Sequence, residues 1–83
     1  MRFQVTDPER WKRMHDTSAR ERTAVGIKAG LVFADSEDPD RLIVIYQVED
    51  IRRARAYLTM SRQTDREFEA GVSEKEMWFG VEP

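Results

Sequence analysis

The segment Arg41-Leu-Ile-Val-Ile-Tyr-Gln-Val48 decides the fold, because it is apolar on both of the faces that a strand presents. Successive side chains of a β-strand point to opposite sides, so positions 42, 44, 46 and 48 share one face and positions 43 and 45 the other. A strand of this kind belongs in a sheet that is covered on both faces. The segment therefore predicts a strand with two buried faces.

The segment that precedes it, over residues 27–34, has a similar character. In an extended conformation one side would carry Ile27, Ala29, Leu31 and Phe33. The 83-residue chain has room for only about two helices of ordinary length, which cover one face of a sheet. We expect a second copy of the chain to cover the other face.

Composition limits the class of protein. Residues 1–83 predict a single domain, since domains typically hold ~100 to 150 residues. Cysteine is absent, which excludes disulfides, and a net charge of −2 argues against a nucleic-acid partner. No apolar run approaches the ~20 residues that span a bilayer, and no signal-peptide pattern follows Met1. We expect a cytoplasmic protein with no membrane partner.

Start and stop signals predict the elements of the first half. A short strand over residues 2–5 leads to Asp7-Pro8, where Asp7 can cap a helix and Pro8 suits its first turn. Trp11 falls on the inner face of this helix. The polar residues 19–25 predict a loop, and Pro39 suits the turn of a hairpin between strands over residues 27–35 and 41–48.

The second half repeats the pattern. Asp50 can cap a second helix. Its pattern restarts with a capping box at Thr64 and Glu67, after which Phe68 packs inward and Gly71 ends the helix. Residues 77–81 predict the last strand.

The resulting order is β-α-β-β-α-β, which predicts an α+β, ferredoxin-like fold with a four-stranded antiparallel sheet. Such a sheet leaves a face of roughly 400 Å² bare, as large as the biggest apolar patches on monomers. We therefore expect a homodimer formed through the sheet face.

Five motifs carry a family resemblance across nearly the whole chain. They are Val5-Thr-Asp-Pro-Glu-Arg-Trp11, Ala24-Val-Gly26, Asp38-Pro39, Val48-Glu-Asp50 and Ala70-Gly71-Val72. On these motifs the chain resembles the dimeric α+β barrel superfamily, and most of all its small antibiotic-biosynthesis-monooxygenase-like or cyclase-like members.

The resemblance implies a barrel of two four-stranded sheets across the dimer, with a pocket between each sheet and its own helices. Known members include cofactor-independent oxygenases, polyketide cyclases and isomerases. The resemblance thus implies a hydrophobic or aromatic small-molecule ligand, handled without a cofactor.

His15 is the candidate catalytic residue. It is the only histidine and lies one turn after Trp11 on the same helical stripe. It can act as a general base or donate a hydrogen bond to a bound carbonyl oxygen. The alternative is a half-exposed histidine that is favoured at a helix C-terminus by the helix dipole.

Four aromatic residues are candidates for lining a substrate pocket, or alternatively for filling the core: Trp11, Phe33, Tyr46 and Trp78. Arg20 and Arg22 lie in the polar segment after the first helix. Either can close over a pocket mouth and hold a carboxylate, or remain a solvated charge.

The other charged groups indicate no metal or cofactor. One His and no Cys cannot assemble a closed zinc site, and the acidic segment of residues 35–40 lacks the glycine and closing Glu of an EF-hand. The basic cluster at Arg52, Arg53 and Arg55 is a solvated helix face or a contact for an acidic partner.

Two functions remain open. The first is a ligand-binding protein or enzyme of the monooxygenase, cyclase or isomerase type. The second is a non-enzymatic dimeric interaction domain that fills its own pocket, which is favoured by the absence of Asn from the chain, since several members of the resembled family use one. An open pocket of ~300 Å³ or more with His15 on its wall distinguishes the first from the second.

Overall fold

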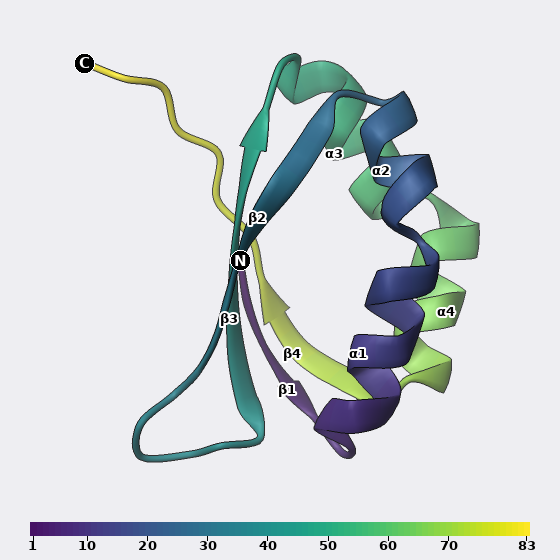
Figure 1. Cartoon of the computed structure of the whole chain (residues 1–83), viewed down its shortest axis with the longest axis vertical. Helices are drawn as coiled ribbons and strands as arrows, with labels where there is room; N and C mark the ends of the chain where they lie inside the picture. Colours follow the sequence, from purple (N-terminus) through teal and green to yellow (C-terminus); the bar gives the residue numbers. More distant parts are fainter.

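A computed structural model describes residues 1–83, apart from the side chain of Ala29. Four helices pack against one face of a four-stranded antiparallel sheet, and in the described chain no helix covers the other face (Figure 1). The predicted α+β class and antiparallel sheet are confirmed. The elements are β1 (Arg2–Val5), α1 (Pro8–Thr17), α2 (Ala19–Ala24), β2 (Ile27–Ala34), β3 (Arg41–Val48), α3 (Ile51–Thr59), α4 (Ser61–Glu69) and β4 (Val72–Glu76).

The strands lie in the order β2-β3-β1-β4, so that β3 is an inner strand between β2 and β1. Leu42 and Val44 of β3 are buried against the helices, whereas Ile45, on the opposite face, is 54% exposed. The segment that is apolar on both faces is therefore covered on only one face within this chain.

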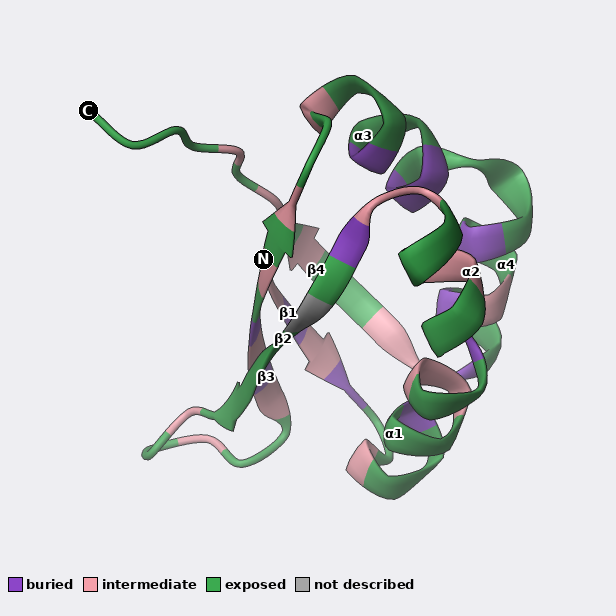
Figure 2. Cartoon of the chain, turned by 45° about the horizontal axis from the view of Figure 1, so that its top comes forward, coloured by how far each residue is buried: buried purple, intermediate pink, exposed green. Residues whose placement is uncertain are grey.

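A register shift between Lys28 and Leu31 changes the face that the side chains of β2 occupy. Ile27, before the shift, is buried on the helix side. Leu31 and Phe33, after it, pair with outward-facing residues of β3 and are exposed (Figure 2). The prediction that Ile27, Leu31 and Phe33 share one face is wrong, because the shift reverses the alternation within the strand. Ala29, the fourth residue of that prediction, has a side chain outside the described part of the structure.

Two glycines are required by close approaches of the backbone. A Cβ atom on Gly30, within the register shift, would collide with the backbone carbonyl oxygen of Ile45. Gly71 ends α4 with a φ of 83°, and a Cβ there would also collide with the side chain of Thr6. The predicted left-handed stop at Gly71 is confirmed.

Both predicted helix starts at aspartate are confirmed. The carboxylate of Asp7 accepts hydrogen bonds from the backbone N–H groups of Glu9 and Arg10, and that of Asp50 accepts them from Arg52 and Arg53. These bonds satisfy donors that have no partner within the helix.

Each half of the chain contains two helices where the sequence predicts one, which corrects two expectations. Residues 19–25, predicted as a loop, contain the helix α2. The helix α4 begins at Ser61, because Met60 adopts an extended conformation, and not at the predicted capping box of Thr64 and Glu67. The side chain of Glu67 turns inward, and Phe68, predicted to pack inward, is 80% exposed.

The last strand also differs from its prediction. β4 covers Val72–Glu76, whereas residues 77–81 form no strand. Beyond β4 the chain passes the start of β1 and extends toward the uncovered side of the sheet (Figure 1). Met77 and Phe79 pack against the core, and the Arg55 guanidinium carbon lies 4.8 Å from the centre of the Phe79 ring.

The buried residues lie mainly where the helices and the sheet face each other (Figure 2). They form two clusters. Tyr46 packs against both of them and so joins the two halves of the core. The first cluster consists of Phe3, Val5, Trp11, Leu42, Val44 and Ala70, and the second of Ile27, Ala54, Tyr57 and Leu58.

None of the described helices has the length and apolar character needed to cross a membrane.

Candidate functional site

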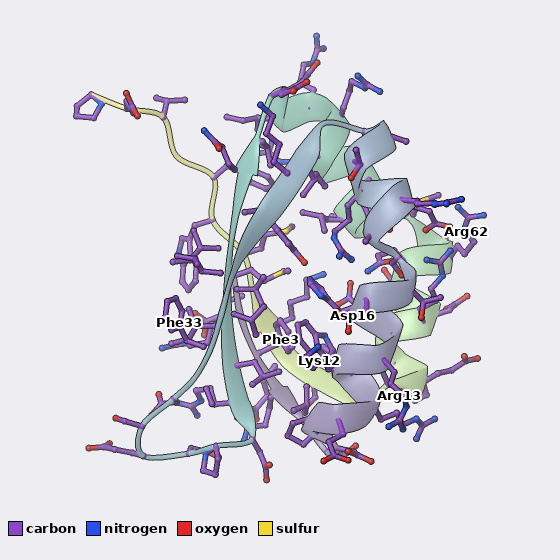
Figure 3. All side chains as sticks on the ribbon, viewed as in Figure 1. Phe3, Lys12, Arg13, Asp16, Phe33 and Arg62 are labelled. Atoms are coloured by element: carbon purple, nitrogen blue, oxygen red, sulfur yellow. The ribbon has the colours of Figure 1, made fainter. Side chains whose placement is uncertain are left out.

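The helix α1 directs Trp11 and His15 toward the sheet, because residues four apart lie on one helical face. The two rings stack with centroids 4.7 Å apart and planes 25° apart. The ring of Phe3 on β1 also contacts that of Trp11, with centroids 5.3 Å apart and planes 48° apart. The Phe3 side chain points from the sheet toward α1 (Figure 3). The ring centroid of His15 also lies 5.9 Å from that of Tyr46 on β3, with planes 9° apart. His15 therefore lies within an aromatic row that runs from β1 to α1 and back to β3.

His15 is held at two points. Its Nε2 atom lies 2.7 Å from the hydroxyl oxygen of Tyr46 on β3. The guanidinium of Arg22 on α2 donates a 2.7 Å hydrogen bond to the backbone carbonyl oxygen of His15. The same guanidinium lies 5.7 Å from the centre of the Tyr46 ring, within range of a cation–π contact. These contacts join α1, α2 and β3 into one polar cluster, formed by His15, Arg22 and Tyr46.

Burial sets the protonation of this cluster. Burial lowers the pKa of the His15 imidazole from its ordinary value of 6.5, and the positive charge of Arg22 lowers it further. The adjacent carboxylate of Asp16 opposes the effect, but its Oδ1 atom lies 3.7 Å from Nδ1, beyond hydrogen-bond distance. Burial also raises the pKa of the Tyr46 hydroxyl to about 12. At neutral pH the imidazole is therefore neutral and the phenol is protonated.

The space around His15 is filled by side chains. The cavity beneath α1, lined by Trp11, His15, Arg22 and Tyr46 among others, has a volume of about 10 Å³. That is close to the least space that holds a single water molecule and far below the ~300 Å³ of small ligand pockets. A neutral imidazole beside a phenol has the chemistry of a proton relay, but this cavity does not admit a substrate.

The other predicted site residues do not join this cluster. Phe33 lies on the opposite face of the sheet from Phe3, at 48% exposure (Figure 3). Trp78 lies beyond β4 at 63% exposure, and Arg20 is exposed on α2. Of the predicted site, the structure brings Trp11, His15, Arg22 and Tyr46 together beneath α1. Phe33 and Arg20 lie apart from this cluster, and Trp78 shares a cleft with Tyr46 alone among the four.

A second polar group, not foreseen from the sequence, lies under α4. The Nζ atom of Lys75 on β4 lies 2.8 Å from a carboxylate oxygen of Glu67, and both side chains are largely buried. The buried amide of Gln63 lies 3.4 Å from the same carboxylate. The ion pair anchors the edge strand β4 to the helix layer.

A third group joins α2 to α4 on the surface of the helix layer. Two guanidinium nitrogens of Arg66 donate to the two carboxylate oxygens of Glu21, at 2.6 and 2.9 Å. The hydroxyl of Tyr57 also donates to Glu21, at 3.1 Å. The hydrogen bonds from Arg66 lower the pKa of the Glu21 carboxyl to about 2, so this carboxylate is charged at neutral pH.

Helical spacing could have indicated the group under α4. Gln63 and Glu67 are four residues apart and Ala70 follows on the same stripe, which is the buried stripe of α4. Phe68 is adjacent to Glu67 in sequence and so points about 100° away, toward solvent. The apolar character of Phe68 led to the opposite assignment.

The described side chains contain no cluster of three or more His, Asp or Glu residues that could hold a metal ion. Comparisons with models of known families, with curated proteins and with solved structures find no match to this chain.

Proposed function

We propose that this chain is a non-enzymatic interaction domain that pairs with a second copy of itself through the uncovered face of its sheet. One observation carries the proposal: Leu31, Phe33 and Ile45 lie together on this face, with exposed fractions of 59%, 48% and 54%. Ile43, paired with Phe33, continues the patch. Contiguous exposed apolar side chains of this kind are typical of a protein–protein contact.

The filled interior favours an interaction domain over an enzyme. A catalytic role for His15 requires a substrate within hydrogen-bond reach of its imidazole. The cavity beside that imidazole has a volume of about 10 Å³, and its Nε2 atom already has the Tyr46 hydroxyl as partner. His15 and Trp11 therefore serve as packing and hydrogen-bonding groups between α1 and the sheet.

The arrangement of the elements supports membership of the dimeric α+β barrel superfamily. When each adjacent pair of helices is counted as one covering unit, the element order is the ferredoxin-like β-α-β-β-α-β. All strand pairs are antiparallel, and the helices leave one face free for a partner sheet (Figure 1). Two such sheets packed face to face form the barrel.

The sheet face alone is too small for a stable dimer interface. Two faces of roughly 400 Å² each bury roughly 800 Å² together, whereas stable interfaces bury ~1,200 Å² or more. The C-terminal residues 77–83 extend toward the same side, where Trp78 and Val81 are 63% and 81% exposed (Figure 1). The interface thus includes these side chains with the sheet patch.

Light scattering after size-exclusion chromatography tests the pairing. At about 100 μM, far above the dissociation constant of an obligate pair, we expect twice the chain mass of 9.8 kDa for the wild type. Phe33→Asp places a charge in the interface and should elute at the chain mass. Phe68→Asp, the same change on exposed α4, should remain dimeric. A wild-type monomer, or a dimeric Phe33→Asp protein, contradicts the proposal.

A second candidate function is the binding of an aromatic small molecule beside the C-terminal segment. A cleft of about 550 Å³ lies between β3 and residues 77–82, and Tyr46, Trp78 and Phe79 contribute to its walls. This volume is within the ~300–1,000 Å³ range of ligand pockets. The cleft brings together two of the four aromatic residues that the sequence indicates for a ligand.

Thermal unfolding with a panel of aromatic acids, quinols and polyketides tests this second function. A ligand that binds the folded chain should raise the melting temperature as its concentration increases. The rise should be lost in Trp78→Ala and kept in Phe68→Ala, which removes an exposed aromatic ring elsewhere. A flat response across the panel leaves the interaction domain as the function.

A further inference from the structure

An open groove lies on the outer surface of the helix layer, between α2 and α3, with a volume of about 490 Å³. We call it the helix groove and define it by Glu21, Ala24, Arg53, Ala56, Met60 and Arg62, with the ring of Tyr57 at its base. The helices α2 and α3, which supply most of its lining, lie on the side of the sheet opposite to the uncovered face (Figure 1). The helix groove is therefore separate from the proposed dimer interface.

The floor of the helix groove is apolar. Ala24 at the end of α2 and Ala56 in the middle of α3 are both exposed, so the two short side chains leave a depression between the helices. Met60 is 37% exposed at one end of it. Flexible methionines and small residues are suited to receive an apolar side chain from a partner.

The rim of the helix groove is basic. Arg53 and Arg62 line it, while Arg20 and Arg52 lie one turn before Ala24 and Ala56 on the same helical faces. Arg53 donates a 2.9 Å hydrogen bond to the carbonyl oxygen of Ala24, which uses a neutral acceptor and leaves its charge uncompensated.

The single carboxylate among the residues that line the groove offsets only part of these charges, because it is shared between two arginines. Glu21 is bound through both oxygens by Arg66, and Arg62 lies 3.5 Å from it. The helix groove thus combines an apolar floor with a net positive rim, in a chain of net charge −2.

We propose that the helix groove binds an acidic amphipathic helix of a partner protein. One or two apolar side chains of this helix enter the floor between Ala24 and Ala56, and its carboxylates face the arginines of the rim. The floor and the rim match the two faces of such a helix, so charge complementarity identifies the occupant.

Other occupants fit less well. Small-molecule sites usually bury ~70–90% of the ligand surface, whereas Ala24, Ala56 and Met60 are all open to solvent. A single-stranded nucleic acid requires exposed aromatic rings on which its bases stack. The ring at this site, that of Tyr57, is buried with 6% exposure.

Selection from a displayed library of random helical peptides tests the proposal. The full chain serves as bait, and the Ala56→Glu variant serves for counter-selection. Glutamate suits an exposed position within a helix, so this variant should fold while it fills the floor and repels carboxylates. The enriched peptides should be acidic and carry apolar residues at positions i and i+3 or i+4.

A peptide synthesised from the enriched sequence gives the quantitative test. We expect Ala56→Glu and Arg62→Glu each to weaken its binding by about tenfold or more, and binding to weaken as salt rises from ~50 to ~500 mM. Arg13→Glu, the same charge change on α1, should leave the affinity unchanged. Circular dichroism confirms that each variant is folded.

Three outcomes overturn the proposal: a library without acidic enrichment, equal binding by Ala56→Glu, or tighter binding of a labelled single-stranded oligonucleotide in the same assay. None of them bears on the dimer, because the variants lie outside the sheet face. A monomeric wild type that still binds the acidic peptide would overturn the proposed pairing and leave this inference intact.

Discussion

The Nε2 atom of His15 lies 2.7 Å from the hydroxyl oxygen of Tyr46, and this contact joins the helix layer to an inner strand of the sheet. The phenol is protonated at neutral pH, because burial raises its pKa to about 12. It can therefore donate its proton to Nε2 of a neutral imidazole. A protonated imidazole has no acceptor at Nε2, so the hydroxyl would have to turn and accept instead.

The first prediction concerns the protonation of His15. Burial, reinforced by the Arg22 guanidinium, should hold the imidazole pKa below 6.5 in the folded chain. A titration followed by NMR measures it directly, since His15 is the only histidine and its ring signals need no further assignment. A pKa at or above 6.5 would show that Asp16, on its own helix, outweighs burial.

The second prediction is a dependence of stability on pH. Because the folded chain has the lower pKa, the unfolded chain binds the proton first as the pH falls. The contribution of His15 to the free energy of unfolding is complete above pH 6.5 and is lost as the pH falls toward the pKa of the folded state. Urea unfolding over this window should show a steeper loss for the wild type than for His15→Gln, which cannot titrate. Parallel curves for the two proteins would contradict the prediction.

The third prediction is the effect of removing the Tyr46 hydroxyl. Tyr46→Phe leaves a buried imidazole nitrogen without its partner, so we expect the free energy of unfolding to fall by about 1–3 kcal/mol. The double variant His15→Leu with Tyr46→Phe replaces both partners by apolar groups. It should lose less than the sum of the two single changes, as measured by chemical unfolding at pH 8. Additive losses would show that the two side chains act independently.

The sequence predicted those parts of the fold that depend on local signals. Asp7 and Asp50 are caps because a short carboxylate before a helix meets free N–H groups, and Gly71 is a stop because the chain needs a positive φ there. The pairing of Trp11 with His15 followed from their helical spacing. Each of these depends on residues within one turn of each other.

The parts that the sequence did not predict depend on contacts between distant segments. The face occupied by Phe33 is set by a register shift against β3, and the register is fixed only when the two strands pair. The inward position of the Glu67 side chain on α4 depends on its ion pair with Lys75, which lies on β4 of the sheet. The filled space beside His15 depends on side chains from α1, α2 and β3 together.

The fourth prediction concerns the ion pair between Glu67 and Lys75, whose side chains are 11% and 22% exposed. Replacing one partner leaves the other charge buried without compensation, so Glu67→Leu should destabilise the fold by about 3 kcal/mol or more. The double variant Glu67→Leu with Lys75→Met removes both charges and should recover most of that loss. Urea unfolding of the wild type, Glu67→Leu, Lys75→Met and the double variant gives the coupling energy. A double variant as unstable as the single one would show that packing, and not charge, is the cause.

The fifth prediction tests the close approach of β2 and β3 at Gly30. A methyl group there would overlap the carbonyl oxygen of Ile45, which belongs to the backbone and cannot rotate away as a side chain could. The two strands must separate locally, so Gly30→Ala should lower the free energy of unfolding by about 1–3 kcal/mol. Gly80→Ala is the matched control, because nothing lies within 4 Å of a Cβ atom at that position. Hydrogen exchange of the β2 and β3 amides locates the effect, since the separation should speed exchange at this hairpin first. Equal stability of the two variants would show that the register shift accommodates a side chain at Gly30.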